Sequence, residues 1–230
     1  QGDWSSDVCS SDLRNLQCSE MQSRAHELIA ATVVSIDPER GNVVLDLGKG
    51  GSAVLPRNEQ VPGETFTEGQ TVQVYVVDVL ATDRGPRVTI SRTHPGLVKR
   101  MFELEVPEIY DGTVEVKAIA REAGARTKLA VWSKNPDVDP VGACIGARGV
   151  RVEKIVQELN GEKIDVIRWS EDITEFISAA LSPAKVVKVE LLPGETKSCR
   201  VTVPDHQLSL AIGNKGQNVR LCAQDRKSVV

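Results

Sequence analysis

Apolar residues occupy every second position, with polar residues between them, along much of the first third of the chain. The alternation is clear over residues 42–47 and 71–79, and segments that contain Gly and Pro interrupt it at 38–41, 48–51 and 83–86. Alternation of this kind predicts strands with one buried face, and Gly and Pro predict the turns between them. Five short strands between about residues 31 and 92 predict a small all-β barrel of the OB type.

The pattern changes after residue 92, where apolar positions also recur at helical spacing. Segment 93–170 predicts a helix, two strands, two helices and a strand, and segment 171–224 repeats this order but stops within its last helix. Each repeat predicts an α+β domain with helices on one face of a sheet. The fold class is therefore α+β multidomain. We expect the second repeat, which lacks the last strand, to be the less stable.

Both ends of the chain lack these periodicities. Residues 7–13 resemble the translation of a sequencing adapter, and so do residues 225–230. We therefore expect non-native sequence at both ends and leave it out of the fold prediction. The remainder of the leader at 1–30 is polar, and its pattern leaves open a disordered lead-in or the stub of a helix.

Composition narrows the possible functions. The net charge is −4 and the pI is about 5.5, so a polyanion would have to be bound by local basic loops. Aromatic residues make up only 3% of the chain, so a nucleic-acid surface cannot depend mainly on base stacking.

The five cysteines form no C-x-x-C pair and have no zinc-like spacing with the three histidines. This favours reduced thiols in a cytoplasmic protein. No apolar run approaches the roughly 18 residues that would span a bilayer, and no signal sequence is evident. Cys144 has no histidine near it in sequence, so we interpret it as a buried thiol rather than a nucleophile. The sequence thus predicts a monomer that is not an enzyme, with no catalytic residues, metal or cofactor and no membrane partner.

A short glycine motif, Ile-Gly-x-[Arg/Lys]-Gly, occurs once in each repeat, at residues 145–149 and 212–216. Glycines at both ends accept positive φ and let the backbone approach a sugar-phosphate chain closely. The helix that follows presents free N–H groups and the positive end of its dipole to a phosphate. Arg148 and Lys215 add a cation within each turn.

A turn of this kind holds the backbone of a nucleic acid, so bases must be read in an apolar groove beside it. In the first repeat we expect the groove between Ile145, Val150, Val152 and the strand at 164–167, with space for four nucleotides of single-stranded RNA. The predicted RNA-binding residues are Ile145, Gly146, Ala147, Arg148, Gly149, Val150, Arg151 and Lys154 in the first repeat, and Ile212, Gly213, Asn214, Lys215, Gly216, Gln217 and Arg220 in the second.

One such glycine pair is as compatible with tight helix packing as with RNA binding. The second occurrence, with the same isoleucine and a cation at the same place, favours RNA binding.

Long runs of the sequence closely resemble the NusA family of bacterial transcription factors over about residues 31–224. They include residues 102–114, 139–146, 181–185 and 207–213. The resemblance implies an S1 barrel at 31–92 and two tandem KH domains at 93–170 and 171–224, the second incomplete. It further implies binding of single-stranded RNA in the nascent transcript. In the full-length family members, RNA polymerase and other elongation factors would be partners in pausing, termination and antitermination.

The sequence departs from the family pattern at both ends. The N-terminal domain with which the family docks on polymerase has no counterpart before residue 31, apart from the possible helix stub. Two other function classes also stay open. S1 and KH domains accompany phosphorolytic exoribonucleases, although in the opposite order, and the acidic barrel is compatible with a protein-interaction scaffold.

Overall fold

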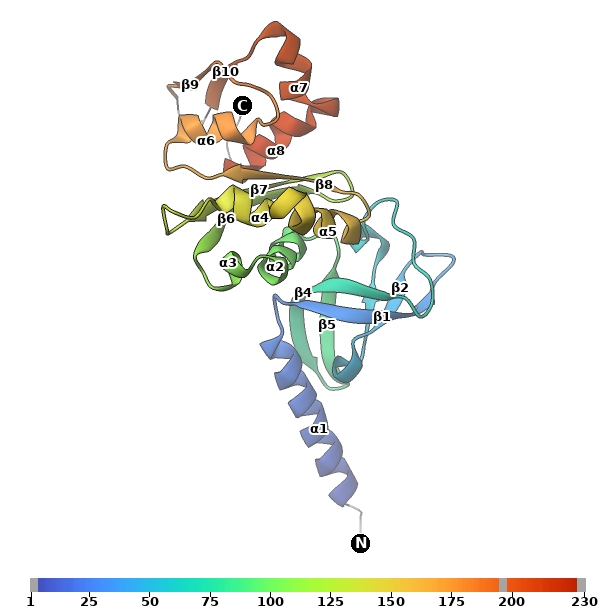
Figure 1. Cartoon of the computed structure of the whole chain (residues 1–230). Coiled ribbons are helices and arrows are strands. Elements are labelled where there is room, and N and C mark those ends of the chain that lie inside the picture. Colours follow the sequence, from blue (N-terminus) through green and yellow to red (C-terminus); the bar gives the residue numbers. More distant parts are fainter. Residues whose placement is uncertain (1–3, 195–197, 227–230) are drawn as a thin grey trace. The chain divides into compact units, whose positions relative to one another are not determined.

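The computed structural model describes residues 4–194 and 198–226 (Figure 1). The chain divides into two compact units, residues 1–100 and 101–230. Within the described ranges, no helix combines the length and the apolar character needed to cross a membrane.

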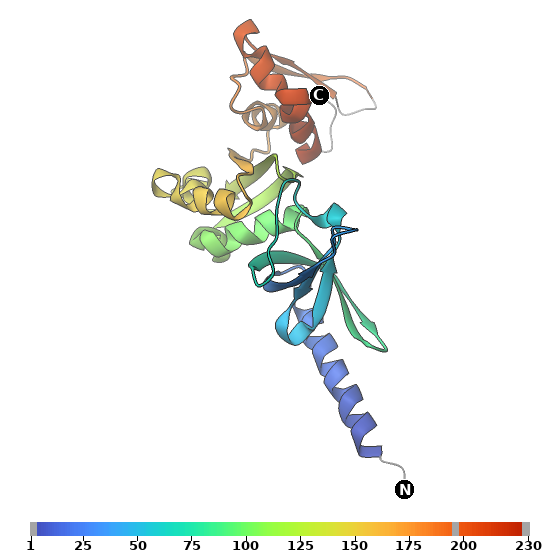
Figure 2. The same ribbon diagram turned by 90° about the vertical axis from the view of Figure 1, so that its right-hand side faces the viewer.

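The first unit contains a five-stranded antiparallel sheet in the order β3-β2-β1-β4-β5. Strand β3 also lies against β5, so the sheet curves into a nearly closed barrel (Figure 2). The predicted OB-type barrel is therefore confirmed. Its strands are β1 (Leu28–Ile36), β2 (Val43–Asp46), β3 (Ser52–Leu55), β4 (Thr71–Thr82) and β5 (Gly85–Ser91).

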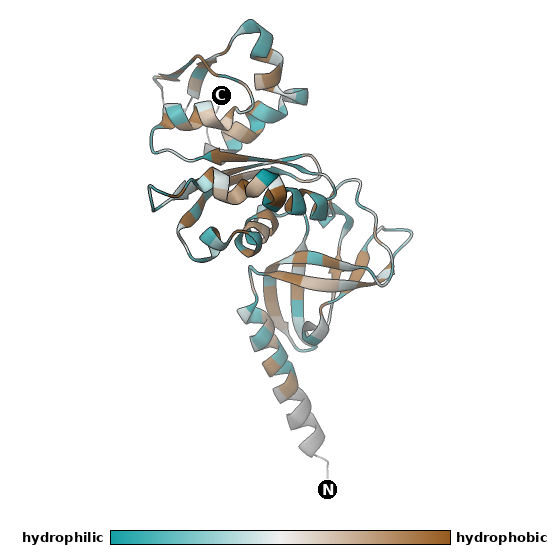
Figure 3. Ribbon diagram, in the orientation of Figure 1, coloured by the Kyte–Doolittle hydropathy of each residue, from teal (hydrophilic) through white to brown (hydrophobic). Residues whose placement is uncertain are grey.

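Alternate residues of these strands form the barrel core, as the period-two pattern predicts. Hydrophobic residues recur along the strands of the barrel (Figure 3). Leu45, Leu55 and Val74 are fully buried within it. Strand β1 begins at Leu28, three residues before the predicted start, because residues 28–32 pair with β4. The backbone pairing there overrides a local sequence that is too mixed to show the alternation.

Residues 4–23 of the leader form a helix, which corresponds to the second of the two alternatives left open for it. Helix α1 (Trp4–Ser23) continues through residues 7–13, the adapter-like segment left out of the fold prediction. Its last turn places Met21 in the barrel core with 2% of its surface exposed, and Arg14 Nη1 donates to the Asp83 carbonyl at 3.1 Å. Of the adapter-like C-terminal segment, residues 227–230 lie outside the described residues.

The second unit begins within α2 and contains two α+β domains. In the first, the sheet order is β6-β7-β8, with β7 antiparallel to β6 and parallel to β8. This is the predicted order of elements, with one addition: Pro107, interpreted from sequence as a helix end, instead begins the short helix α3, as proline commonly does at a first helical position. The elements are α2 (Pro95–Glu105), α3 (Pro107–Tyr110), β6 (Val114–Glu122), β7 (Arg126–Ser133), α4 (Pro140–Ile145), α5 (Val150–Glu158) and β8 (Lys163–Arg168).

The second α+β domain repeats the arrangement on a smaller sheet. Among the residues that the structure describes, its sheet has two antiparallel strands, β9 and β10. Its elements are α6 (Ile173–Ala180), β9 (Lys188–Leu192), β10 (Ser198–Thr202), α7 (Leu208–Ile212) and α8 (Gln217–Arg226).

The two α+β domains share one apolar core. Ala130 of β7 and Ile167 of β8 pack in the same cluster as Phe176 of α6 and Cys222 of α8. Beside this cluster, the buried Lys128 ammonium donates to Asp165 at 3.0 Å and to the Ser182 carbonyl at 2.9 Å. One face of the first domain's sheet therefore serves as part of the second domain's core.

Candidate nucleic-acid interface

Each glycine motif forms a tight turn between two helices. In the first, α4 ends at Ile145 and α5 begins at Val150, and Gly146 and Gly149 have φ values of 75° and 80°. In the second, Gly213 and Gly216 have φ values of 76° and 74°. These are left-handed conformations that favour glycine, so the two turns have the same backbone geometry, as the motif predicts.

The basic residue within each turn also has a left-handed backbone conformation. Arg148 has φ 56° and Lys215 has φ 51°, which is uncommon for residues with a Cβ and costs about 1–2 kcal/mol each. Both side chains are exposed, and within the described residues neither has a carboxylate partner. Each turn thus holds one cation in solvent, available to a phosphate.

Arg151 packs against the first turn. A Cβ on Gly146 would lie 2.7 Å from Arg151 Cγ, so the side chain lies directly over the glycine. The guanidinium donates to the Ala143 carbonyl at 2.6 Å and to Glu108 at 2.9 Å. Arg151 therefore braces the turn from behind, and an additional role in guiding RNA stays a prediction.

Asn218 occupies the equivalent position in the second turn, five residues after the first glycine. Its backbone nitrogen would lie 2.8 Å from a Cβ on Gly213. The side chain is buried, and its Nδ2 donates to the Leu181 and Ala211 carbonyls, both at 3.0 Å. Sequence reasoning missed this residue, although the matching offset of Arg151 and Asn218 from their glycines could have revealed it.

The remaining predicted cations are held in ion pairs. Lys154 Nζ lies 3.0 Å from a Glu105 oxygen, and Arg220 pairs with Glu122 at the end of β6. Gln217 also donates to Glu122, at 2.8 Å. The Arg220 hydrogen bond is the main reason that the pKa of Glu122 is lowered from its ordinary value. Glu122 thus joins the first α+β domain to the helix that follows the second turn.

Some of the apolar side chains predicted to line the groove are exposed, and one is buried. Val150 is 55% exposed and Ile212 is 43% exposed, and Ile145 is half-buried. Ile167, expected to line the groove, is 3% exposed in the shared core on the opposite face of the sheet, so that expectation was wrong. The reason is the strand period of two, which places Ile164 and Val166 on one face and Ile167 on the other.

Cys144 is fully buried, and this burial raises the pKa of its thiol to about 12. Such a thiol stays protonated at neutral pH and is a poor nucleophile. Among the described residues, no group of His, Cys, Asp and Glu side chains is arranged to hold a metal ion.

Sequence profiles of known domains match the chain in three consecutive segments. The S1 RNA binding domain matches residues 23–91, the NusA-like first KH domain 92–169 and the NusA-like second KH domain 173–224. The chain belongs to the NusA family. An S1 barrel followed by two KH domains is thus confirmed, and the two turns are the glycine loops of the first and second KH domains.

Relatives that carry the name "Transcription termination/antitermination protein NusA" agree with this assignment. The protein of Halalkalibacterium halodurans is 58% identical over 182 residues, which are 79% of this chain and 47% of the relative. The Bacillus subtilis protein is 50% identical over 211 residues, 92% of this chain and 56% of the relative. The Thermus thermophilus protein is 48% identical over 211 residues, 92% of this chain and 54% of the relative. The chain therefore spans about half the length of these NusA relatives.

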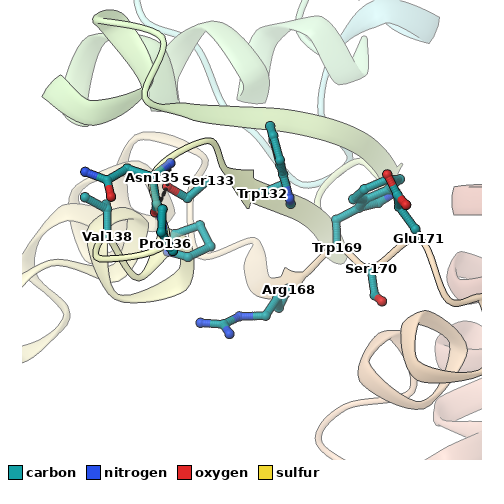
Figure 4. A pocket seen from close by; sticks show the side chains of 10 residues that line it. Trp132, Ser133, Asn135, Pro136, Val138, Arg168, Trp169, Ser170 and Glu171 are labelled. Carbon is teal, nitrogen blue, oxygen red and sulfur yellow. Dashed lines mark hydrogen bonds between the residues drawn. The ribbon is translucent and has the colours of Figure 1, made fainter.

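Sequence reasoning also missed a pocket at one end of the first KH sheet (Figure 4). Two tryptophans, Trp132 and Trp169, line it side by side. They are far apart in sequence, and the pairing of β7 with β8 brings them together. Only knowledge of that pairing register could have predicted the pocket.

Proposed function

We propose that this chain binds single-stranded RNA in the nascent transcript and takes part in transcription termination and antitermination. RNA polymerase and other elongation factors are the partners proposed for the longer cytoplasmic protein, and this chain acts as a binding module rather than an enzyme. The names of the relatives support the proposed role in transcription termination and antitermination. The observation that carries the binding proposal is the repeated glycine loop with an exposed cation at positive φ.

The loop geometry supports a backbone clamp. Gly149 is the N-cap of helix α5, so the cap residue has no side chain that could accept from the N–H groups of the first turn. A phosphate beside the loop can accept from these groups and gain from the helix dipole, with Arg148 as a counter-charge. The second loop offers Lys215 in the same geometry. Exposed apolar side chains such as Val150 can then contact bases.

The clamp is tested by reversing the charge of both loops. A variant that combines Ala147→Asp, Arg148→Asp, Asn214→Asp and Lys215→Asp places carboxylates against phosphate. We expect its affinity for a fluorescein-labelled RNA to fall on the order of 100-fold at low salt. Loss of two phosphate contacts should also reduce the salt slope by about 1.4. The thermal unfolding midpoint should change little, because the loop tips are exposed.

The matched control exchanges the cations, Arg148→Lys with Lys215→Arg, and should retain binding. Unchanged affinity in the charge-reversed variant would reject the clamp. The same titrations address the other function classes: shortening of the RNA would favour an RNA-processing enzyme, and lack of binding even at low salt would favour a protein-interaction scaffold.

A further inference from the structure

The pocket at one end of the first KH sheet has an unusual lining for a chain so poor in aromatic residues. Its volume is about 290 Å³, near the lower limit for small-molecule sites. Two of the chain's three tryptophans, Trp132 and Trp169, line it together with Pro136 and Arg168 (Figure 4). The other lining residues are Ser133, Asn135, Val138, Pro140, Ser170 and Glu171. A pocket of this size and with this aromatic lining suits one planar ring system.

The sheet register fixes the two indoles beside each other. Ala130 pairs with Ile167 and Val131 with Arg168 across the parallel β7–β8 ladder, so Trp132 and Trp169 are the next residues on the same face. The backbone N–H of Trp169 donates to the Val131 carbonyl at 2.8 Å, which continues the ladder to this point. Both side chains are half-buried, so they are held in place with part of each ring exposed.

The charges around the rings suit a nucleotide. Lys117 Nζ lies 4.7 Å from the ring centre of Trp132 and 5.6 Å from that of Trp169. Arg168 is 65% exposed and pairs at 2.9 Å with Asp139, which is 60% exposed. Exposed pairs of this kind contribute little stability, so a phosphate can replace the Asp139 carboxylate at small cost.

The pocket meets the candidate RNA groove at Arg168, at the edge of the sheet. By the strand period of two, Arg168 lies on the groove face of β8, whereas Trp169 lies with Ile167 on the opposite face. Pro140 begins α4, whose other end leads into the Gly146 loop, and Arg168 ends β8, the edge strand beside the groove. Helix α4 has six residues and is therefore about 9 Å long. A strand clamped by the first loop can thus pass Arg168 at the sheet edge and place a neighbouring base in the pocket. A proline-rich peptide would also suit an aromatic surface, but nothing would connect it to the loop.

We propose that this pocket binds one base of the single-stranded RNA held by the first glycine loop. The base stacks on the exposed indole surface of Trp132 and Trp169, and its phosphate contacts Arg168. Glu171 at the rim accepts a hydrogen bond from an exocyclic amino group, which favours adenine or cytosine over uracil. This proposal rests on the proposed RNA binding and adds a site outside the glycine loops.

The chain offers a direct optical test, since Trp4→Phe leaves fluorescence only from the two pocket tryptophans. The titration uses RNA hexamers of adenine or of uracil, with binding followed independently by anisotropy of a labelled hexamer. We expect the adenine hexamer to quench the tryptophan emission and an adenine tetramer, which is long enough only for the groove, to quench it much less.

A second measurement uses pocket variants of the whole chain. Trp132→Leu should weaken hexamer binding on the order of 10-fold while tetramer affinity is unchanged, and Trp132→Phe should restore most of it because a ring remains. Arg168→Gln should lower the salt slope for the hexamer alone. Since the fluorescence titration keeps both pocket tryptophans, it does not depend on whether Trp132→Leu folds.

The outcomes separate the pocket from the clamp. Hexamer binding that is lost in the loop variant, with no tryptophan quenching and no effect of Trp132→Leu, would overturn the pocket and leave the proposed function intact. Absence of any RNA binding would overturn both. Quenching by a proline-rich peptide but not by RNA would assign the pocket to a protein partner instead.

Discussion

The two KH domains hold nearly identical glycine loops by different means. The first braces its loop with the Arg151 side chain and has a three-stranded sheet of its own. The second places the backbone of Asn218 against its loop and completes its core with Ala130 and Ile167 of the first domain. The loop geometry is thus independent of the brace, whereas the stability of the second domain depends on the first. Substitutions that destabilise the first domain should therefore destabilise the second as well, whereas substitutions in the core of the second should leave the first domain's sheet stable.

The largest effect is expected from Glu162, which is fully buried beneath the β6–β7 turn. Its carboxylate accepts from Arg121 Nε and Nη2 and from the Gly124 N–H, all at 2.9 Å, and from the Thr127 hydroxyl. Glu162→Ala removes the carboxylate from a buried guanidinium and should cost about 3–5 kcal/mol. Urea unfolding and hydrogen exchange should show both KH domains losing protection together.

Glu162→Gln is the control, because it keeps the shape and an acceptor oxygen and should lose less. Protection that falls in the first domain while the second stays unchanged would contradict the dependence of the second domain on the first.

Phe176 tests the reverse direction. Its side chain is fully buried in α6, where it belongs to the core shared with Ala130. Phe176→Ala should cost about 3–5 kcal/mol through the cavity it leaves. Hydrogen exchange should accelerate in α6–α8 and remain slow in β6–β8, because the first sheet keeps its own helices on the other face. Even without substitution, the second domain should be the less protected of the two, and equal protection in both would refute the asymmetry.

Alanine at the first glycine of each loop compares the two braces directly. Both Gly146→Ala and Gly213→Ala incur about 1–2 kcal/mol because φ is left-handed. The new Cβ of Gly213→Ala also meets the Asn218 backbone at 2.8 Å, which cannot rotate away, whereas that of Gly146→Ala meets the flexible Arg151 side chain. We expect the larger loss of stability and RNA affinity in the second loop.

The second glycines are matched controls. A Cβ at Gly149 or Gly216 would meet no atom within 4 Å, so alanine there should cost only the φ strain, equally in both domains. A Gly146→Ala variant as damaging as Gly213→Ala would show that Arg151 is as rigid as backbone.

Local sequence was sufficient to predict the features of the fold that are determined by residues close together in the chain. The period-two strands of the barrel and the positive φ of Gly146 and Gly213 follow from residue types within a few positions. Contacts between distant residues could not be predicted: the Arg151 brace uses Glu108, 43 residues away, and the tryptophan pocket needs the β7–β8 register. Ile167 is different: the strand period of two already separates it from Ile164 and Val166, and only its packing against Phe176 of the other domain lies beyond local sequence.

The smallest effect is expected from Glu122, which links the first domain to Gln217 and Arg220 after the second loop. Because the Arg220 hydrogen bond lowers the pKa of Glu122 below its ordinary 4.5, the link stabilises the fold fully above pH 4.5 and is lost as the pH falls through the lowered pKa. Glu122→Gln should therefore cost about 1 kcal/mol or less at pH 7 and almost nothing at low pH. A double-mutant cycle with Arg220→Met, measured by urea unfolding at both pH values, isolates the pair. A coupling energy that does not decrease on acidification would show that the Glu122 carboxylate does not hold the second loop's helix against the first domain.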